Sequence, residues 1–509
     1  MGGSKRMPEE LLGKFKKKIT PEWKKGFIAT WIIGLLTHLI IFTQYIPNHD
    51  GLVNTYADQL NFGLGRFFLG PVSWIGSYFD LSMINGLLSI FYMSLLVIVL
   101  IELLNLKKSF SIYMLAGVLV TFPVITSTFA YMFTADAYIF GYFMVALALL
   151  VTLKWRFGFL LGSVFFYVAV GIYQANLPFA MALATVVIIH RLLDSERSLK
   201  EILLDLGRMI ATVVGGMGLY AVTFFLYQRL STSIRNYQGL NEIGERSDSI
   251  RALLTESKDD FLDFFVGGIV SDGTITMFHI ANAIVLVLLI AFVVAFAFKR
   301  PVHRILLVAG GIVIIPFFTY SLYFVSPGVV YHVLMIMGLV TLYMTLIVFY
   351  EYATTQKVLA WFSVLALSLT IFNSAIIANI SYLHLQLRFE KTTQFANRVI
   401  ARIESQPEYT RETKVAIVGR YAVRSSVGAG PVKEQLPALT GIVGERILIV
   451  PYQFNYFFDT VLGTPVKYAK SDEIEALKET EEFQQMPTWP REGAVDTING
   501  IVVVKFQEK

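Results

Sequence analysis

The chain has 509 residues, of which 55% are hydrophobic and 16% charged, and its mean hydropathy is +0.61. A soluble globular fold cannot bury this much apolar surface, so the composition indicates an α-helical polytopic membrane protein. The sequence contains no cysteine, which excludes disulfides, thiolate nucleophiles and cysteine-based metal sites, and the location of its net charge of +5 argues against nucleic acid as a partner.

Residues 1–26 form a basic tail, in which eight Lys and Arg residues lie between Lys5 and Lys25. Such a tail is typical of a cytoplasmic anchor against anionic membrane lipids.

Residues 27–382 are predicted to form the transmembrane domain. A window of about 20 residues predicts about eleven membrane-spanning helices there. The pair at 157–173 and 178–190 is short, so it is expected to be either a full hairpin or a re-entrant pair. The expected spans are 27–46, 81–104, 111–130, 137–153, 157–173, 178–190, 209–228, 277–298, 304–324, 329–350 and 358–380.

Lys and Arg gather in alternate loops on the side of the basic tail, whereas the loops at 131–136, 174–177 and 325–328 carry neither residue. This asymmetry predicts a cytoplasmic N-terminus, and an odd number of spans then places the C-terminus outside. The larger outer loops are expected at 47–80 and 230–276.

Residues 383–509 have an ordinary globular composition and are predicted to form a small extracytoplasmic α/β domain. A helix is expected at 385–404 and strands at 414–419, 446–451 and 501–506. The domain has no glycine-rich phosphate-binding motif, so no nucleotide site is expected in it.

The first candidate catalytic residue is Asp50, which follows the first span in the string Pro47-Asn48-His49-Asp50-Gly51. A charge at the rim of a bilayer is costly, so it usually lines a cavity or site. The alternative interpretation is a solvated turn, which favours these same residue types.

The second candidate is Asp136, at the outer end of the third span. It is expected either to meet Asp50 in space or to cap the fourth span as a helix N-cap.

Arg66 lies in the segment 58–71, whose polar and aromatic residues suit a helix in the membrane interface. A guanidinium there is suited to binding a phosphate, although it can also snorkel toward lipid headgroups. The pairs Tyr173-Gln174 and Tyr331-His332 complete the outer polar set, either as site residues or as interfacial anchors.

Several of these strings together resemble the bacterial membrane glucosyltransferases of the type II serotype-converting group, which are similar to the wider glycosyltransferase C superfamily. The resemblance is densest over residues 40–180 and implies a GT-C-like membrane domain with catalytic acids at Asp50 and Asp136. The strings that carry it are Pro47–Asn54, Gly65–Pro71, Asp80–Ser89, Ala135–Tyr138 and Tyr173–Ala175.

The resemblance implies transfer of glucose from an undecaprenyl-phosphate carrier to a cell-envelope glycan, such as O-antigen or a similar glycopolymer. The reaction would take place on the outer face of the bacterial cytoplasmic (inner) membrane, with a separate donor-lipid synthase and flippase as partners. Around the two acids we expect donor-phosphate and substrate contacts from Arg66, Asn48, His49, Asn54, Tyr138, Tyr173, Gln174 and His332.

The chemistry agrees with this set, because a glycosyl phosphate needs mainly a base for the acceptor hydroxyl and a cation for the departing phosphate. Asp50 is the expected base, with inversion at the sugar, and Asp136 is expected to hold sugar hydroxyls or share that role.

No cofactor is required and no residue set compels a metal, although two carboxylates are compatible with Mg²⁺ or Mn²⁺. The alternatives are a multi-span transporter or flippase, whose acids would lie at mid-membrane, and a non-catalytic scaffold of glycan assembly.

Overall fold

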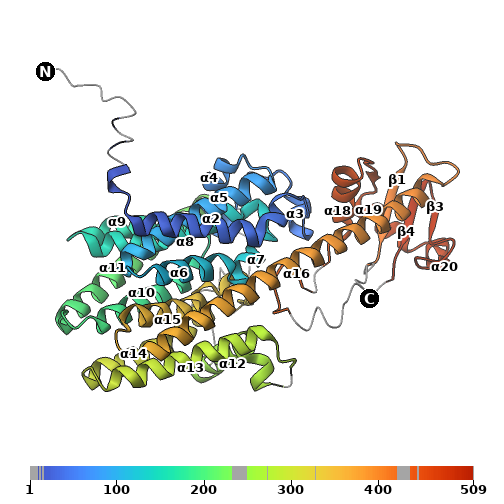
Figure 1. The fold of residues 1–509 in the computed structure, drawn as a ribbon. Coiled ribbons are helices and arrows are strands. Elements are labelled where there is room, and N and C mark those ends of the chain that lie inside the picture. Colours follow the sequence, from blue (N-terminus) through green and yellow to red (C-terminus); the bar gives the residue numbers. More distant parts are fainter. Residues whose placement is uncertain are drawn as a thin grey trace.

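The computed structural model describes residues 10, 13, 16–231, 249–271, 273–326, 328–420, 436–443 and 446–507. A bundle of helices makes up most of the molecule, and a long last helix leads from it to a small domain with a sheet (Figure 1). The principal helices are α2 (Pro21–Phe42), α5 (Ser82–Leu103), α6 (Ser109–Thr121), α7 (Pro123–Phe129), α8 (Met132–Lys154), α9 (Gly158–Ile172), α10 (Asn176–Leu193), α11 (Leu199–Leu230), α12 (Ile250–Val270), α13 (Met277–Ala297), α14 (Val302–Thr319), α15 (Val340–Tyr352) and α16 (Lys357–Glu404).

Within the described residues, eight helices are long and apolar enough to cross a membrane, and the bent pair α6–α7 makes a ninth candidate. The two helices of this pair meet at 44°, where Phe122 is extended because the residue before Pro123 disfavours helical backbone angles. The shorter apolar helix Gly158–Ile172 coincides with the span predicted at 157–173, and Met337–Tyr352 covers the second part of the one predicted at 329–350. The chain is therefore a helical membrane protein, and the count of about eleven spans stays a prediction.

One predicted span differs clearly from the structure. Instead of a helix throughout 329–350, an extended stretch and two short 3-10 turns, Val333–Met335 and Met337–Leu339, precede α15. The irregular stretch lines a cavity, as described below, which is where a membrane protein tolerates non-helical backbone.

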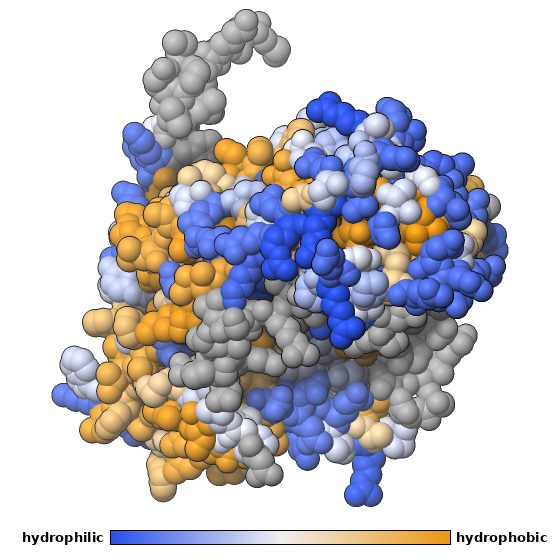
Figure 2. Space-filling view, turned by 90° about the vertical axis from the view of Figure 1, so that its right-hand side faces the viewer, coloured by the Kyte–Doolittle hydropathy of each residue, from blue (hydrophilic) through white to orange (hydrophobic). Residues whose placement is uncertain are grey.

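Large apolar side chains cover the outside of the bundle. Leu36, Phe298 and Trp361 are 79%, 85% and 75% exposed, as expected for side chains that contact lipid. The end of the molecule seen in Figure 2 is instead largely hydrophilic, and orange hydrophobic surface appears at its flank.

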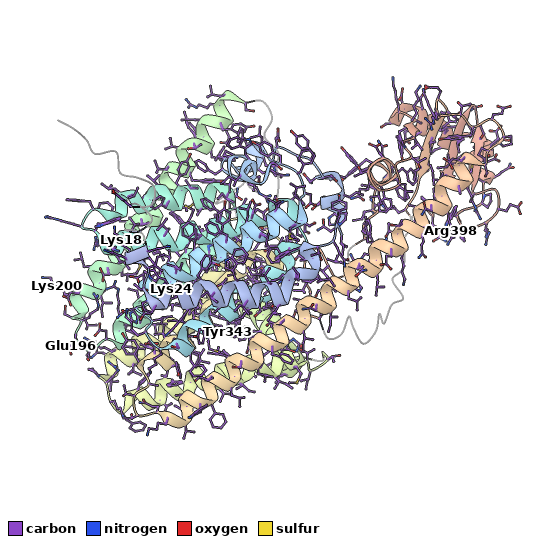
Figure 3. All side chains as sticks on the ribbon, turned by 45° about the horizontal axis from the view of Figure 1, so that its top comes forward. Lys18, Lys24, Glu196, Lys200, Tyr343 and Arg398 are labelled. Atoms are coloured by element: carbon purple, nitrogen blue, oxygen red, sulfur yellow. The ribbon has the colours of Figure 1, made fainter. Side chains whose placement is uncertain are left out.

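The basic tail and the far part of α16 lie at opposite ends of the molecule. In Figure 3, Lys18 and Lys200 lie toward one end and Arg398 lies toward the other. The tail and the α10–α11 loop thus share an end, as the predicted orientation requires. Residues 1–9 of the predicted tail and residues 232–248 of the outer loop 230–276 lie outside the described residues.

Helix α16, the last helix of the bundle, is longer than expected. Its 48 residues form one continuous helix, whereas the sequence predicts a span at 358–380 and a separate helix at 385–404. Residues 381–384 contain neither glycine nor proline, so nothing ends the helix there. At about 1.5 Å per residue it is roughly 70 Å long, about twice the thickness of the hydrocarbon core.

The C-terminal domain packs against the far half of α16, where Phe395, Val399 and Ile403 join its hydrophobic core. Its described residues form a four-stranded sheet in the order β2-β1-β4-β3. Strand β1 is parallel to β2 and β4, and β3 pairs antiparallel with β4. The strands are β1 (Lys414–Val418), β2 (Lys467–Tyr468), β3 (Val495–Ile498) and β4 (Ile501–Lys505), and the helices are α18 (Pro451–Tyr456), α19 (Ser471–Lys478) and α20 (Glu481–Gln485).

The predicted strands at 414–419 and 501–506 are confirmed, but the one at 446–451 is wrong. Ile447 and Leu448 are buried in the core without forming a strand, and Pro451 begins α18. The apolar run at 446–451 therefore predicted burial correctly but did not predict the type of secondary structure.

Candidate functional site

Asp50 lies on a one-turn helix, α3 (His49–Val53), rather than in a solvated turn. The side-chain oxygen of Asn48 accepts hydrogen bonds from the backbone N–H groups of Asp50, at 3.1 Å, and of Gly51, at 2.7 Å. Asn48 is buried, whereas the Asp50 side chain is 47% exposed and its Oδ2 lies 3.5 Å from Nε2 of His49. The turn therefore holds Asp50 in place and leaves its carboxylate accessible.

Asn54 closes the same turn. Its Nδ2 donates to the backbone oxygen of Asp50 at 2.9 Å, and its Oδ1 accepts from Gln59 at 3.2 Å. These bonds assign Asn54 to positioning the loop.

Asp80 is a third acid beside this turn, and the sequence interpretation missed it. Its side chain is 9% exposed, and its Oδ2 lies 3.6 Å from the point where a side chain on Gly51 would begin. Burial raises the pKa of Asp80 to about 7. Asp80 directly precedes the span predicted at 81–104, and Asp50 follows the one predicted at 27–46. Both acids thus lie near the end of a predicted span, and that position could have identified Asp80.

Asp136 lies inside α8 and is 1% exposed. The interpretation as an N-cap is wrong, because Tyr131 occupies that position. Oδ2 of Asp136 has no hydrogen-bond partner among the described residues and lies 3.3 Å from the point where a side chain on Gly76 would begin. The side-chain oxygen of Asn85 lies 2.9 Å from the same point, so Asp136 and Asn85 both lie against Gly76.

Arg66 points into the protein and contacts two tyrosines. Its Nη1 donates to the Tyr138 hydroxyl at 3.1 Å, and its guanidinium carbon lies 5.1 Å from the centre of the Tyr173 ring. The rings of Tyr138 and Tyr173 stack at 4.7 Å with an interplanar angle of 2°. Snorkelling toward lipid headgroups therefore does not describe this arginine.

The segment around Arg66 is not the interfacial helix expected over 58–71. A 3-10 turn at Phe62–Leu64 ends at Gly65, whose φ of 70° favours glycine, and a short helix follows at Leu69–Ser73. Nε2 of Gln174 donates to the Leu64 carbonyl at 2.7 Å and to the Tyr220 hydroxyl at 3.0 Å, which anchors the turn to α11.

Two cavities flank His332 in the part of the chain that the structure describes. The smaller, of about 120 Å³, is mainly apolar and is lined by Arg66, Tyr173, Gln174 and His332 among others. The larger, of about 570 Å³, is lined by α12, by the loop between α14 and α15, and by the segment 436–443 of the C-terminal region.

The segment 436–443 connects these cavities to the Asp50 turn. Oγ1 of Thr440 accepts a hydrogen bond from the backbone of Val333, next to His332, at 3.0 Å. A side chain on Gly441 would begin 3.0 Å from Nδ2 of Asn48, so Gly441 packs directly on the cap of α3. Sequence reasoning missed this segment because it carries no charged or catalytic residue type.

The predicted residues thus form two clusters. One lines the smaller cavity with Arg66, Tyr173, Gln174 and His332, and Tyr138 contacts its Arg66; the other is the turn with Asn48, His49, Asp50 and Asn54. Asp136 belongs to neither cluster.

The apolar helical bundle, with an arginine at a mainly apolar cavity and an accessible acid on a separate turn, defines a polytopic membrane protein with candidate polar site residues. The family model described as Glucosyl transferase GtrII matches residues 39–350, more than half of the chain. The chain therefore belongs to the glucosyl transferase GtrII family, as the sequence resemblance predicts, and membership indicates glucosyl transfer at a membrane. Comparisons with curated proteins and with solved structures find no match.

Proposed function

We propose that the protein transfers glucose from a polyprenyl-phosphate-linked donor to a cell-envelope glycan, O-antigen or a similar polymer, on the outer face of the bacterial inner membrane. Family membership supports glucosyl transfer and argues against the transporter and scaffold alternatives. The donor, the acceptor and the orientation are part of the proposal.

The observation that carries the choice of donor is the position of Arg66. Its half-buried guanidinium lies beside an apolar cavity formed with α9, α10 and α11. A lipid phosphate combines an anion that binds a guanidinium with a hydrocarbon chain that suits apolar walls, whereas a nucleotide sugar would place a polar base and ribose there.

In the proposed reaction, the acceptor hydroxyl oxygen attacks the anomeric carbon of glucose. The bond between that carbon and the phosphate oxygen breaks, and polyprenyl phosphate leaves with the electron pair. The acceptor proton passes to a carboxylate, for which we propose Asp50 because its side chain is accessible on a capped turn. Arg66 stabilises the charge that develops on the departing phosphate.

Asp136 is proposed to support the fold of the outer region rather than to share the role of base, because its side chain is buried against Asn85 and Gly76. His332 is proposed as a substrate contact, since it lines both cavities.

The test uses the full chain in proteoliposomes with polyprenyl-phosphate-[¹⁴C]glucose and, separately, with UDP-[¹⁴C]glucose. Membranes of cells that lack both the chain and the donor-lipid synthase supply the acceptor. We expect labelled glycan only with the lipid-linked donor. Equal or better transfer from UDP-glucose would overturn the assignment of the donor.

A further inference from the structure

The larger cavity has the dimensions and chemistry of a carbohydrate site. Its volume of about 570 Å³ lies in the usual range for small-molecule sites. Four parts of the chain line it: helix α12, the α12–α13 loop with the start of α13, the α14–α15 loop with Tyr320 and Tyr331, and the segment 436–443.

Helix α12 supplies the acidic wall. Asp260 and Asp263, one turn apart, both line the cavity. Oδ2 of Asp260 accepts a hydrogen bond from the Tyr323 hydroxyl at 2.6 Å, which fixes the orientation of the carboxylate. Burial raises the pKa of Asp260, and the nearby Asp263 and Asp259 raise it further.

The backbone of α12 also departs from helical geometry beside the cavity. Val266 departs from helical geometry, with φ −140° and ψ 19°, and Gly267 and Gly268 follow it in the cavity wall. The N–H of Gly268 donates to Nδ1 of His279 at 3.2 Å, so the other ring nitrogen of a neutral His279 carries the proton. The cavity wall therefore combines the carboxylates of Asp260 and Asp263 with the His279 ring and the backbone of two glycines. Sugar hydroxyls both donate and accept hydrogen bonds, so they suit a wall that offers both kinds of group.

Aromatic rings complete the enclosure. Tyr320, Tyr323 and Tyr331 form a cluster with ring centres 4.6 to 6.3 Å apart, and Tyr320 and Tyr331 line the cavity. Aromatic faces suit the apolar face of a sugar ring, whose hydroxyls then point to the polar wall.

His332 is the residue that relates this cavity to the Arg66 cavity, because it lines both. Arg66 and His332 line the same smaller cavity, so a glucosyl group on a phosphate bound at Arg66 has His332 as a neighbour in that cavity. The polar volume beyond His332 is then available for the second substrate, and the segment 436–443 of the C-terminal region forms its other wall.

We propose that this cavity binds the acceptor glycan, with Asp260 and Asp263 accepting hydrogen bonds from its sugar hydroxyls. The inference rests on the proposed function and extends it, because it locates the second substrate and assigns two binding residues outside the turn of Asp50. It also gives the segment 436–443 a part in choosing the acceptor.

The experiment is transfer by Asp260→Asn and Asp263→Asn proteins in proteoliposomes with polyprenyl-phosphate-[¹⁴C]glucose. Acceptor-containing membranes from cells that lack both the chain and the donor-lipid synthase are titrated in one series, and the donor in another. We expect the half-saturating amount of acceptor to rise about tenfold in each variant, as for loss of a hydrogen bond to a charged group. The half-saturating donor concentration should stay within about twofold of the parent.

Asp259→Asn is the matched control, because Asp259 is adjacent in sequence but its side chain is 61% exposed and pairs with Lys258 at 3.0 Å. Asp263 is itself exposed, so its variant is expected to fold even if the Asp260 variant does not. Unchanged acceptor titrations in a folded Asp263→Asn protein, or a shift in the donor titration alone, would overturn the proposal.

A second measurement separates this inference from the proposed function. A single cysteine introduced as Ser271→Cys lies in the cavity wall of a chain that has no other cysteine. Oligosaccharides released by mild acid from the acceptor membranes should slow its reaction with a thiol reagent. Slowed labelling without transfer from the lipid donor would refute only the donor assignment, whereas unaffected labelling would refute the acceptor site.

Discussion

The rings of Tyr138 and Tyr173 lie parallel, with centroids 4.7 Å apart, and Arg66 contacts both residues. Tyr138 belongs to α8 and Tyr173 directly follows α9, so the stack joins two helices at the point where the guanidinium is held. Because the Tyr138 hydroxyl and the Tyr173 ring already orient Arg66, its side chain loses little conformational entropy when it binds an anion.

The first prediction therefore concerns the Tyr138 hydroxyl. Tyr138→Phe keeps the stacked ring but removes the acceptor of the Arg66 hydrogen bond. We expect the half-saturating concentration of polyprenyl-phosphate-glucose to rise about three- to tenfold, with an unchanged acceptor titration. An unchanged donor titration would show that the hydroxyl does not position Arg66.

The second prediction concerns Arg66 itself. Arg66→Ala should weaken donor use about tenfold to a hundredfold, and more than Arg66→Lys, which keeps the charge but loses the planar fork. Arg229→Ala is the control, because Arg229 also lies over an aromatic ring, that of Phe225, but does not line the cavity. If both Arg66 variants use the donor like the parent, the phosphate is bound elsewhere.

The third prediction concerns the proposed base. Asp50→Asn keeps the shape of the side chain and the Asn48 cap, so the protein should insert and fold normally. Transfer should fall about a hundred- to ten-thousandfold, as for loss of a general base. Asp58→Asn, an exposed carboxyl in the same loop, should retain parental activity. Near-parental turnover by Asp50→Asn would remove Asp50 from the mechanism.

The fourth prediction concerns pH and Asp80. Burial raises the pKa of this carboxyl from 3.8 to about 7, so the folded protein holds a proton there that the unfolded chain releases above about pH 4. Folding stability from this group is therefore fully present below about pH 4 and is lost as the pH rises toward and through about 7.

An asparagine side chain cannot titrate, so Asp80→Asn should flatten the fall of the thermal unfolding temperature in detergent between about pH 4 and pH 7. Asp58→Asn is again the control, because Asp58 is exposed in the same loop. Parallel curves for the parent and Asp80→Asn would contradict the raised pKa.

The fifth prediction concerns orientation. Ser471→Cys places a single thiol on the exposed start of α19, and Ser195→Cys places one in the exposed α10–α11 loop at the basic end. An impermeant thiol reagent applied to intact spheroplasts should label the first variant and spare the second until the membrane is broken. The reverse pattern would overturn the outer-face placement of Asp50 and Arg66.

The sequence by itself determined the class of protein and the place of most of its helices, because a bilayer admits only apolar segments of sufficient length. It also singled out Arg66, Tyr173 and Gln174, and the structure shows that these three residues line one cavity. The strands at 414–418 and 501–505 followed from short β-branched runs between polar stretches.

Only the tertiary structure decided which outer residues meet. Asp136 and Asp50 both lie near span ends in the sequence, but Asp136 is buried in α8 beside Gly76, whereas Asp50 is accessible on α3. The return of the segment 436–443 onto Val333 and Asn48 joins residues far apart in the chain, and no local pattern encodes such a contact. The length of an apolar segment is a local property of the sequence. A cavity, by contrast, exists only where several segments pack and leave space between them.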